Sequence, residues 1–307
     1  MMTAYISHKD CELHDMGAGH PECPRRLSAI RDYLMERQLW DVLLHVDAPK
    51  IEKIHLYRVH GREYVDGIFS QFPIKQTKTL GDDMVANAHT LNAALRSAGG
   101  VCKAVDMVMN GQAANAFCAV RPPGHHAEKN RAMGFCVFSN VAVAAAYAIH
   151  QYDLDRVAIV DFDVHHGNGT ENILQYDERV LFCSSFQHPY YPHTVPDQNR
   201  SNIVHTPMHA GTSSDEFRDW VLQQWMNKLH QFNPQLLLIS AGFDAHHSDP
   251  LADIYLDDRD YYWLTSELKR LAENCCEGRI VSSLEGGYHL DALARSVYQH
   301  IRVLSGL

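Results

Sequence analysis

The stretch VDFDVHHGNG carries Asp161, Asp163, His165 and His166 directly after an apolar run. In an extended chain alternate side chains share a face, so Asp161, Asp163 and His165 would point to the same side. A carboxylate and an imidazole two residues apart can hold one small cation. With a further ligand from another strand and one position left for water, the set would be typical of a catalytic zinc site. The stretch therefore predicts metal chemistry.

Groups with similar chemistry follow three other apolar runs. RPPGHHAE carries His125 and His126, AGFDAHH carries Asp244, and EGGYHL carries Tyr288. Because the carboxyl ends of parallel strands meet at one edge of a sheet, we expect all four segments to converge there. Asp244 would then complete the ligand set of Asp163 and His165.

The elements that must position these groups alternate along the chain. Strands are expected at 116–120, 157–160, 180–184, 235–240 and 280–284. Helices are expected at 87–109, 141–151, 214–231 and 258–274. Ser213 and Glu216 form a capping-box pattern before the third helix. This alternation predicts an α/β fold, with a mostly parallel sheet flanked by helices on both faces and a single domain over residues 1–307.

Composition narrows the class of protein. A formal charge of −10 and a pI near 6.1, without a Lys/Arg block, argue against nucleic acid and are compatible with a cationic substrate. The 21 histidines favour metal binding and proton transfer. The eight cysteines show no CxxC pair, and no leader follows Met1, so we expect free thiols and a cytoplasmic protein. The longest apolar run, 141–149, is too short for a membrane span.

Five segments in a fixed order resemble the histone deacetylase superfamily, which includes acetylpolyamine amidohydrolases and bacterial deacetylase-like enzymes. They are GHPECPRRL, RPPGHHAEKNRAMGFCVFSN, VDFDVHHGNGTENI, SAGFDAHHSDPLA and LEGGYH. The Asn of HHGNG is closer to the class II and amidohydrolase branches. The resemblance implies an arginase/deacetylase fold and a zinc-dependent amidohydrolase that removes acetyl or another short acyl group from an amine.

The same resemblance assigns the metal ligands. Asp163, His165 and Asp244 would bind one zinc ion per chain, although iron or cobalt could replace zinc in such an O/N/O site. A structural monovalent cation, potassium, is implied near a second set of residues. Its members are Asp161, Asp163, His165, Ser184 and Ser185.

The resemblance also assigns the catalytic groups. His126, oriented by Asn168, would be the general base and then the acid, while His125, fixed by Asp161, would tune the electrostatics. An aspartate partner makes an imidazole more basic and a neutral asparagine leaves it less so, which suits His126 to the role of base. The two roles could be reversed, because coupled histidines titrate as a pair. Tyr288, after two glycines, would donate a hydrogen bond to the oxyanion.

A narrow substrate tunnel is implied as well. Its residues would be Asp83, Gly134, Phe135, Tyr191 and Gly287. Phe135 would form one wall, and the segment 184–195, which departs from the common family pattern, would supply Tyr191 opposite. Asp83 would be the rim carboxylate. Asp82 fits equally well by spacing, and either aspartate could instead cap the following helix.

Three alternatives accompany this interpretation. An acetylated polyamine or a small metabolite presents the same amide as acetyl-lysine in a protein or peptide. A two-manganese ureohydrolase needs DxHxD, but Gly167 and His246 stand where the additional carboxylates would be. A non-catalytic acyl-lysine binder predicts loss of a ligand, a tandem histidine or the tyrosine, and none is lost. The sequence defines no oligomeric state.

Overall fold

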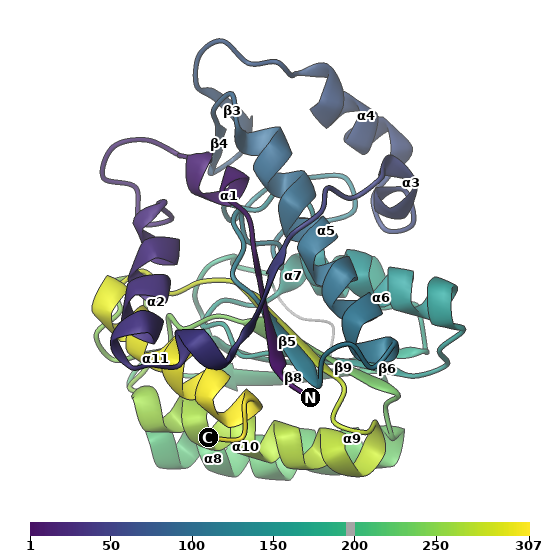
Figure 1. Cartoon of the computed structure of the whole chain (residues 1–307), viewed down its shortest axis with the longest axis vertical. Coiled ribbons are helices and arrows are strands. Elements are labelled where there is room, and N and C mark those ends of the chain that lie inside the picture. The colour runs from purple at the N-terminus through teal and green to yellow at the C-terminus, as the bar shows by residue number, and fades with distance from the viewer. Residues whose placement is uncertain (195–199) are drawn as a thin grey trace.

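The computed structural model describes residues 1–194 and 200–307 (Figure 1). In this part of the chain eight parallel strands form one sheet, in the order β2-β1-β5-β10-β9-β6-β7-β8. The strands are β1 Thr3–Ser7, β2 Leu44–Asp47, β5 Asn115–Cys118, β6 Val157–Asp161, β7 Val180–Gln187, β8 Ile203–Met208, β9 Leu236–Ala241 and β10 Ile280–Leu284. A separate antiparallel hairpin joins β3 Lys78–Gly81 to β4 Met84–Ala86.

Helices cover both faces of the sheet (Figure 1). Helices α5 and α6 contact strands from one face, whereas α11 contacts α2 and α10 on the other, where η2 lies against β8. The helices are α1 Asp10–Leu13, α2 Arg25–Glu36, η1 Trp40–Val42, α3 Lys53–Leu56, α4 Arg62–Ser70, α5 Thr90–Met109, α6 Asn140–Tyr152, α7 Asn168–Leu174, α8 Ser214–Trp220, η2 Val221–Met226, α9 Asn227–Phe232, α10 Asp258–Cys275 and α11 Leu290–Leu304. The predicted fold class is confirmed.

The four strands that were expected to carry the chemistry are neighbours in the middle of the sheet. Strands β5, β10, β9 and β6 are buried along their whole length, as continuous apolar-rich runs in a doubly covered parallel sheet should be. Asp161 at the end of β6 is paired in register with Ser240 of β9 and Ser184 of β7. The loops that follow these strands therefore leave the sheet side by side.

Two predicted helices differ from the structure in detail. The helix expected at 214–231 is helical throughout, but its middle part, η2, is π-helical between α8 and α9. Its capping box is present, with the backbone N–H of Ser213 donating to Glu216 at 2.9 Å. The helix expected from residue 87 begins at Thr90, because the side chain of Asn87 accepts the N–H of His89 at 3.0 Å in a local turn.

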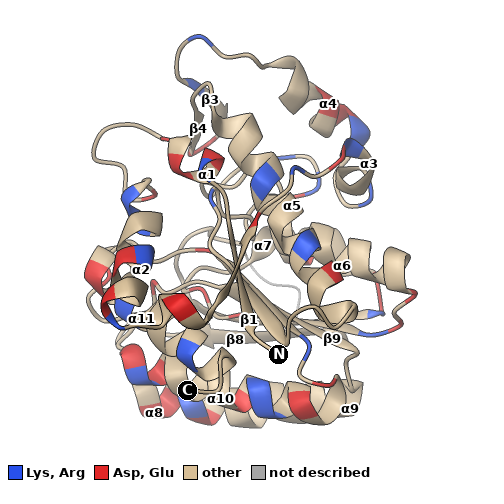
Figure 2. Ribbon diagram, viewed as in Figure 1, with Lys and Arg blue, Asp and Glu red and all other residues tan. Residues whose placement is uncertain are grey.

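Acidic and basic residues are spread over the helices and loops around the sheet, and both kinds occur on α2 and α10 (Figure 2). All eight cysteines are free thiols, as predicted. Within residues 1–194 and 200–307, none of the helices combines the length and the apolar character that a bilayer crossing requires.

Candidate active site

The three predicted metal ligands come together at the carboxyl edge of the sheet. Asp163 and His165 lie in the loop after β6, and Asp244 lies in the loop after β9. His165 Nδ1 is 3.1 Å from Asp163 Oδ1 and 3.1 Å from Asp244 Oδ2. All three side chains are buried, and their ligand atoms lie within 4.8 Å of one another. Such a cluster of two carboxylates and one imidazole can hold a divalent cation.

Backbone groups fix the two carboxylates in place. The N–H of Val164 donates to Asp244 Oδ1 at 2.9 Å, and the N–H of Gly286 donates to Asp163 Oδ2 at 2.8 Å. A Cβ atom at Gly286 would lie 2.1 Å from Asp244 Oδ2 and 2.6 Å from Asp163 Oδ2. The first glycine of the GGY segment is therefore required for the close approach of this loop to the ligand cluster.

The electrostatics of the cluster favour a positive charge between the carboxylates. Burial would raise the pKa of Asp163, but His125 and His165 hold it well below its usual value. Burial and the neighbouring Asp163 raise the pKa of Asp244. The pKa of His165 is raised to about 10 despite burial, because Asp163 and Asp244 both bond its ring. The residues present therefore fit a bound cation.

The tandem histidines have different partners. His125 Nδ1 is 3.0 Å from Asp161 Oδ2, and burial, which lowers its pKa, is outweighed by Asp163 and Asp161, which raise it well above the usual value. His126 Nδ1 is 2.8 Å from Asn168 Oδ1. Burial and the charge of His125 hold the pKa of His126 well below its usual value. The different partners therefore favour a cationic His125 and a neutral His126.

A cavity of about 380 Å³ opens above this cluster. Its lining residues are Asp83, His126, Gly134, Phe135, His165, Tyr190, Tyr191, His193, Leu251 and Tyr288. The rings of Phe135 and Tyr288 meet edge to face at 6.1 Å, and Tyr191 meets His126 in the same way at 5.2 Å. Burial raises the pKa of the Tyr288 phenol well above 10, so it stays a neutral hydrogen-bond donor.

Four of the five predicted substrate residues line this cavity, and Gly287 does not. The carbonyl of Gly287 accepts a hydrogen bond from Arg26 Nε at 2.7 Å, and its φ of +116° makes the turn that precedes Tyr288. The resemblance placed Gly287 among the substrate residues, whereas in the structure this glycine shapes the loop before Tyr288.

The structure distinguishes Asp83 from Asp82. Asp83 accepts the N–H of Gly134 at 2.6 Å and the hydroxyl of Tyr191 at 2.7 Å. The side chain of Asp82 is 81% exposed and lies 3.8 Å from Arg131. Both aspartates lie between β3 and β4, so neither caps α5. Of the predicted wall 184–195, Val195 lies outside the described residues.

Two serines predicted at a monovalent-cation site lie beneath the catalytic loops. Ser184 and Ser185 are fully buried, and neither hydroxyl oxygen has a hydrogen-bond partner among the described residues. Buried hydroxyl groups without partners are rare, and a cation or an ordered water would satisfy them. The residues present therefore fit the predicted cation.

Sequence reasoning missed a buried network behind Tyr288. Arg26 donates to the carbonyls of Gly287 and Glu285, and its guanidinium lies 5.1 Å from the Tyr288 ring. Asp249 accepts the N–H groups of Tyr288 and His289 at 2.6 and 3.2 Å. Burial raises the pKa of Asp249 to about 7.

A second carboxylate that the sequence analysis did not identify supports the loop that carries His125 and His126. Glu285 directly follows β10, and its Oε2 accepts the N–H groups of Gly124 and His125 at 2.7 and 3.1 Å. Burial raises its pKa to about 7. Arg26, Asp249 and Glu285 all lie inside the segments that carry the chemistry. A signal existed for Glu285, which is three residues before Tyr288, and for Asp249, which is five residues after Asp244, but not for Arg26.

Comparisons with known proteins agree with this geometry. The histone deacetylase domain matches residues 20–304. A probable deacetylase of Archaeoglobus fulgidus is 34% identical over 304 residues, covering 95% of this chain and 82% of that protein. Polyamine deacetylase HDAC10 of Homo sapiens is 33% identical over 333 residues, covering 100% of this chain and 48% of that protein.

The structural comparison gives the same result. The crystal structure of the HDA15 HD domain superposes with a TM-score of 0.92 at 32% identity, covering 100% of this chain and 90% of that chain. The parallel sheet, the buried ligand cluster and the pocket above it define a hydrolase of the deacetylase class. The chain belongs to the histone deacetylase family.

Proposed function

We propose that this protein is a zinc-dependent deacetylase that hydrolyses acetyl-lysine side chains. Asp163, His165 and Asp244 would hold one zinc ion per chain, and the observation that carries the proposal is their convergence below the aromatic cavity. When bound, zinc supplies Lewis-acid polarisation of the acyl carbonyl and lowers the pKa of a bound water toward 7. A potassium ion near Ser184 and Ser185 would stabilise the loops from below.

His126 is suited to remove a proton from the attacking water. The amide nitrogen of Asn168 donates to Glu128 Oε1 at 2.8 Å, so the amide oxygen faces His126 and accepts its Nδ1–H. The lone pair is therefore on Nε2. A neutral imidazole with this tautomer takes the proton at Nε2 and later returns it to the leaving amine.

His125 and Tyr288 would stabilise the charge that develops on the carbonyl oxygen. His125 keeps its proton because Asp161 and Asp163 favour the cationic form, and a fixed positive charge lowers the energy of a nearby anion. Tyr288 lines the cavity and remains protonated, so its phenol can donate to the oxyanion. Asp249 holds the backbone of Tyr288 and acts as a positioning residue.

The walls of the cavity suit an aliphatic chain that ends in an amide. Phe135 and Tyr191 present aromatic surfaces, and Leu251 adds an apolar one. Asp83, at the same cavity, accepts the N–H of Gly134 at Oδ1 and the hydroxyl of Tyr191 at Oδ2. It is the one acidic residue in the described lining of the cavity, so the cavity offers little negative charge to a polycationic amine, which favours the lysine chain of a peptide. An acetylated polyamine is the second candidate, supported by the net charge of −10.

The test is turnover of zinc-loaded protein on a panel of an acetyl-lysine peptide, acetylated putrescine, acetylated spermidine and a longer acyl-lysine peptide. We expect efficient cleavage of the acetyl-lysine peptide and a fall of about 10²–10³ in kcat for Tyr288→Phe, because one oxyanion donor is lost. The matched control is Tyr176→Phe, since that side chain is 75% exposed and its ring lies on the surface. Preference for a polyamine would replace the first candidate with the second, and cleavage of no amide would contradict the proposal.

A further inference from the structure

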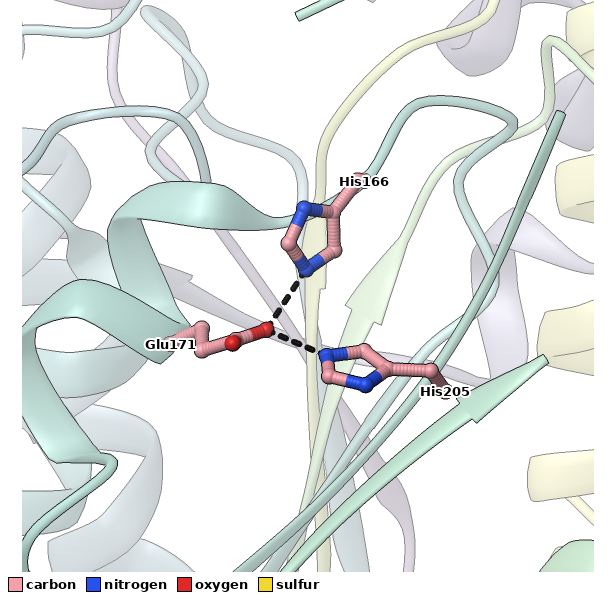
Figure 3. A group of neighbouring side chains, drawn as sticks. All are labelled: His166, Glu171 and His205. Atoms are coloured by element: carbon pink, nitrogen blue, oxygen red, sulfur yellow. Dashed lines mark hydrogen bonds and ion pairs between the residues drawn. The ribbon is translucent and has the colours of Figure 1, made fainter. Parts of the chain in front are cut away.

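A second group of ligand-type side chains lies outside the catalytic cluster (Figure 3). His166 lies in the loop after β6, Glu171 lies on α7 and His205 lies on β8. Both imidazoles point at the same carboxylate oxygen: His166 Nε2 is 2.7 Å and His205 Nε2 is 2.6 Å from Glu171 Oε2. None of the three lines the substrate cavity.

The three side chains are almost completely shielded from solvent. Their exposed fractions are 5% for His166, 9% for Glu171 and 5% for His205. Glu171 thus presents a buried carboxylate oxygen to two buried ring nitrogens, and a cation held between these three groups would compensate the charge of the carboxylate.

We propose that His166, Glu171 and His205 form a second zinc site, distinct from the catalytic one. Two imidazole nitrogens and one carboxylate oxygen are ordinary zinc ligands, and the three candidate ligand atoms already lie within 4.8 Å of one another. Ligands about 2.0–2.1 Å from a tetrahedral zinc lie roughly 3.3 Å apart. Each imidazole would therefore move by roughly 0.6 Å from its position against Glu171 when zinc displaces the two hydrogen bonds.

Contacts around the group favour this assignment. The other ring nitrogen of His166, Nδ1, is 3.0 Å from the hydroxyl of Thr194, the kind of outer hydrogen bond that fixes a metal-binding imidazole. The ring of Phe186 packs against His166 at 4.7 Å and against His205 at 6.0 Å. The ligands are thus held by a loop, a helix and a strand that meet here.

Occupancy of this site would also stabilise the wall of the substrate cavity. Thr194 directly follows His193, and His193, Tyr190 and Tyr191 line the cavity. A zinc ion on His166 would hold the Thr194 hydroxyl through the imidazole and so restrain this segment. Three protein ligands leave the fourth position of a tetrahedral zinc to water, and because none of them lines the substrate cavity we assign the site to stabilisation of the fold and not to catalysis. The inference does not depend on the proposed reaction, because it uses different ligands.

The first test is zinc content after stripping, reloading with Zn²⁺ alone and desalting. We expect two zinc ions per chain in the wild type, one in His205→Asn, one in Asp244→Ala and none in the double variant. One zinc in the wild type, unchanged by His205→Asn, would overturn the inference and leave a hydrogen-bonded cluster. Absence of deacetylase activity in wild-type protein that holds two zinc ions would instead count against the proposed function alone.

A second test needs no variant. Diffraction data from zinc-soaked wild-type crystals, collected on both sides of the zinc absorption edge, should show an anomalous peak between His166, Glu171 and His205. A peak at the catalytic cluster with none at this group would overturn the inference.

A third test uses thermal unfolding. In Asp244→Ala, zinc should raise the Tm, and adding His205→Asn should abolish that rise.

Discussion

His126 Nδ1 lies 2.8 Å from the side-chain oxygen of Asn168, whereas the adjacent His125 bonds the Asp161 carboxylate at 3.0 Å. The two rings are only 3.9 Å apart, so a charge on one strongly affects the other. The neutral side chain of Asn168 leaves His126 neutral, whereas the anionic Asp161 favours the cationic form of His125. This difference in partners supports the proposed roles of His126 as the base and of His125 as the electrostatic group.

Replacing Asn168 by Asp tests the assignment through pH dependence. A carboxylate beside His126 would raise its pKa, and the base works only when it is deprotonated. The acidic limb of the kcat/KM profile should therefore move to higher pH in Asn168→Asp. Asn172→Asp is the matched control, because Asn172 is exposed on the same helix. An acidic limb that stays in place would contradict the role of His126 as base.

Replacing Gly134 by Ala tests the position of the base. A Cβ atom there would lie 2.2 Å from His126 Cδ2, so the ring must move, and displacing a catalytic group by about 1 Å can cost about 100-fold in rate. Gly111→Ala is the control, since Gly111 also has a positive φ, +64°, but has nothing within 4 Å of the added atom. Gly111→Ala should lose about 1–2 kcal/mol of stability from its positive φ, Gly134→Ala should lose at least that much because of the added overlap, and only Gly134→Ala should lose activity. Equal activities would show that the cavity tolerates the added methyl group.

Replacing Asp249 tests the positioning of Tyr288. Asp249→Ala removes the acceptor of the Tyr288 and His289 N–H groups, so kcat should fall at least tenfold while zinc content and KM change little. Asp249→Asn keeps one side-chain oxygen for these donors and should recover part of the lost kcat. Steady-state kinetics of both variants are the measurement. A loss confined to KM, or no difference between the two variants, would remove Asp249 from this role.

Replacing Glu22 tests the buried network that supports the loop. Glu22 pairs with Arg121 and with Arg26, all at 0% exposure. Neutralising it in Glu22→Gln leaves buried guanidinium groups uncompensated and should cost about 3–5 kcal/mol in urea unfolding. The half-exposed pair of Glu12 and Arg31 is the control, and Glu12→Gln should cost less than about 1 kcal/mol. An equal loss of unfolding free energy in Glu22→Gln and Glu12→Gln would show that the buried ion pairs of Glu22 contribute no more than the surface pair.

The pKa of Glu22 also predicts how stability depends on pH. Burial raises this pKa, but Arg121 and His14 outweigh burial and hold it well below the usual value. A carboxyl group with a depressed native pKa stabilises the fold above its unfolded pKa and loses that contribution as pH falls. Wild-type stability should therefore decline below about pH 4.5 by an amount that Glu22→Gln lacks. If the unfolding free energies of the wild type and of Glu22→Gln fell by the same amount below this pH, the low native pKa of Glu22 would be contradicted.

The sequence predicted the part of the fold that carries the chemistry. Strands β5, β6, β9 and β10 could be recognised in the sequence as short continuous apolar runs, because a parallel strand covered by helices on both faces has no polar face. Strand β8 was missed because His205 and Pro207 interrupt its apolar pattern and part of it is exposed. The group of His166, Glu171 and His205, proposed above as a second zinc site, was missed with it. Helices α2 and α11 and strands β1 and β2 were not predicted either.

The sequence predicted those site residues whose type and spacing alone indicate their chemistry. It did not predict those whose role depends on being buried in the folded protein. Asp163, His165 and Asp244 could be identified by type, spacing and resemblance. The distinction between Asp83 and Asp82 needed the hairpin turn that directs one inward. Arg26 follows another arginine in the sequence, and only packing shows that it is fully buried behind Tyr288.

The most direct test of the central claim is turnover of an acetyl-lysine peptide by protein stripped of metal and then reloaded with zinc. The account predicts that the stripped wild type is inactive, that zinc restores turnover, and that Asp244→Ala stays inactive under the same reloading. Full turnover by the stripped protein, or wild-type turnover by Asp244→Ala, would contradict the account.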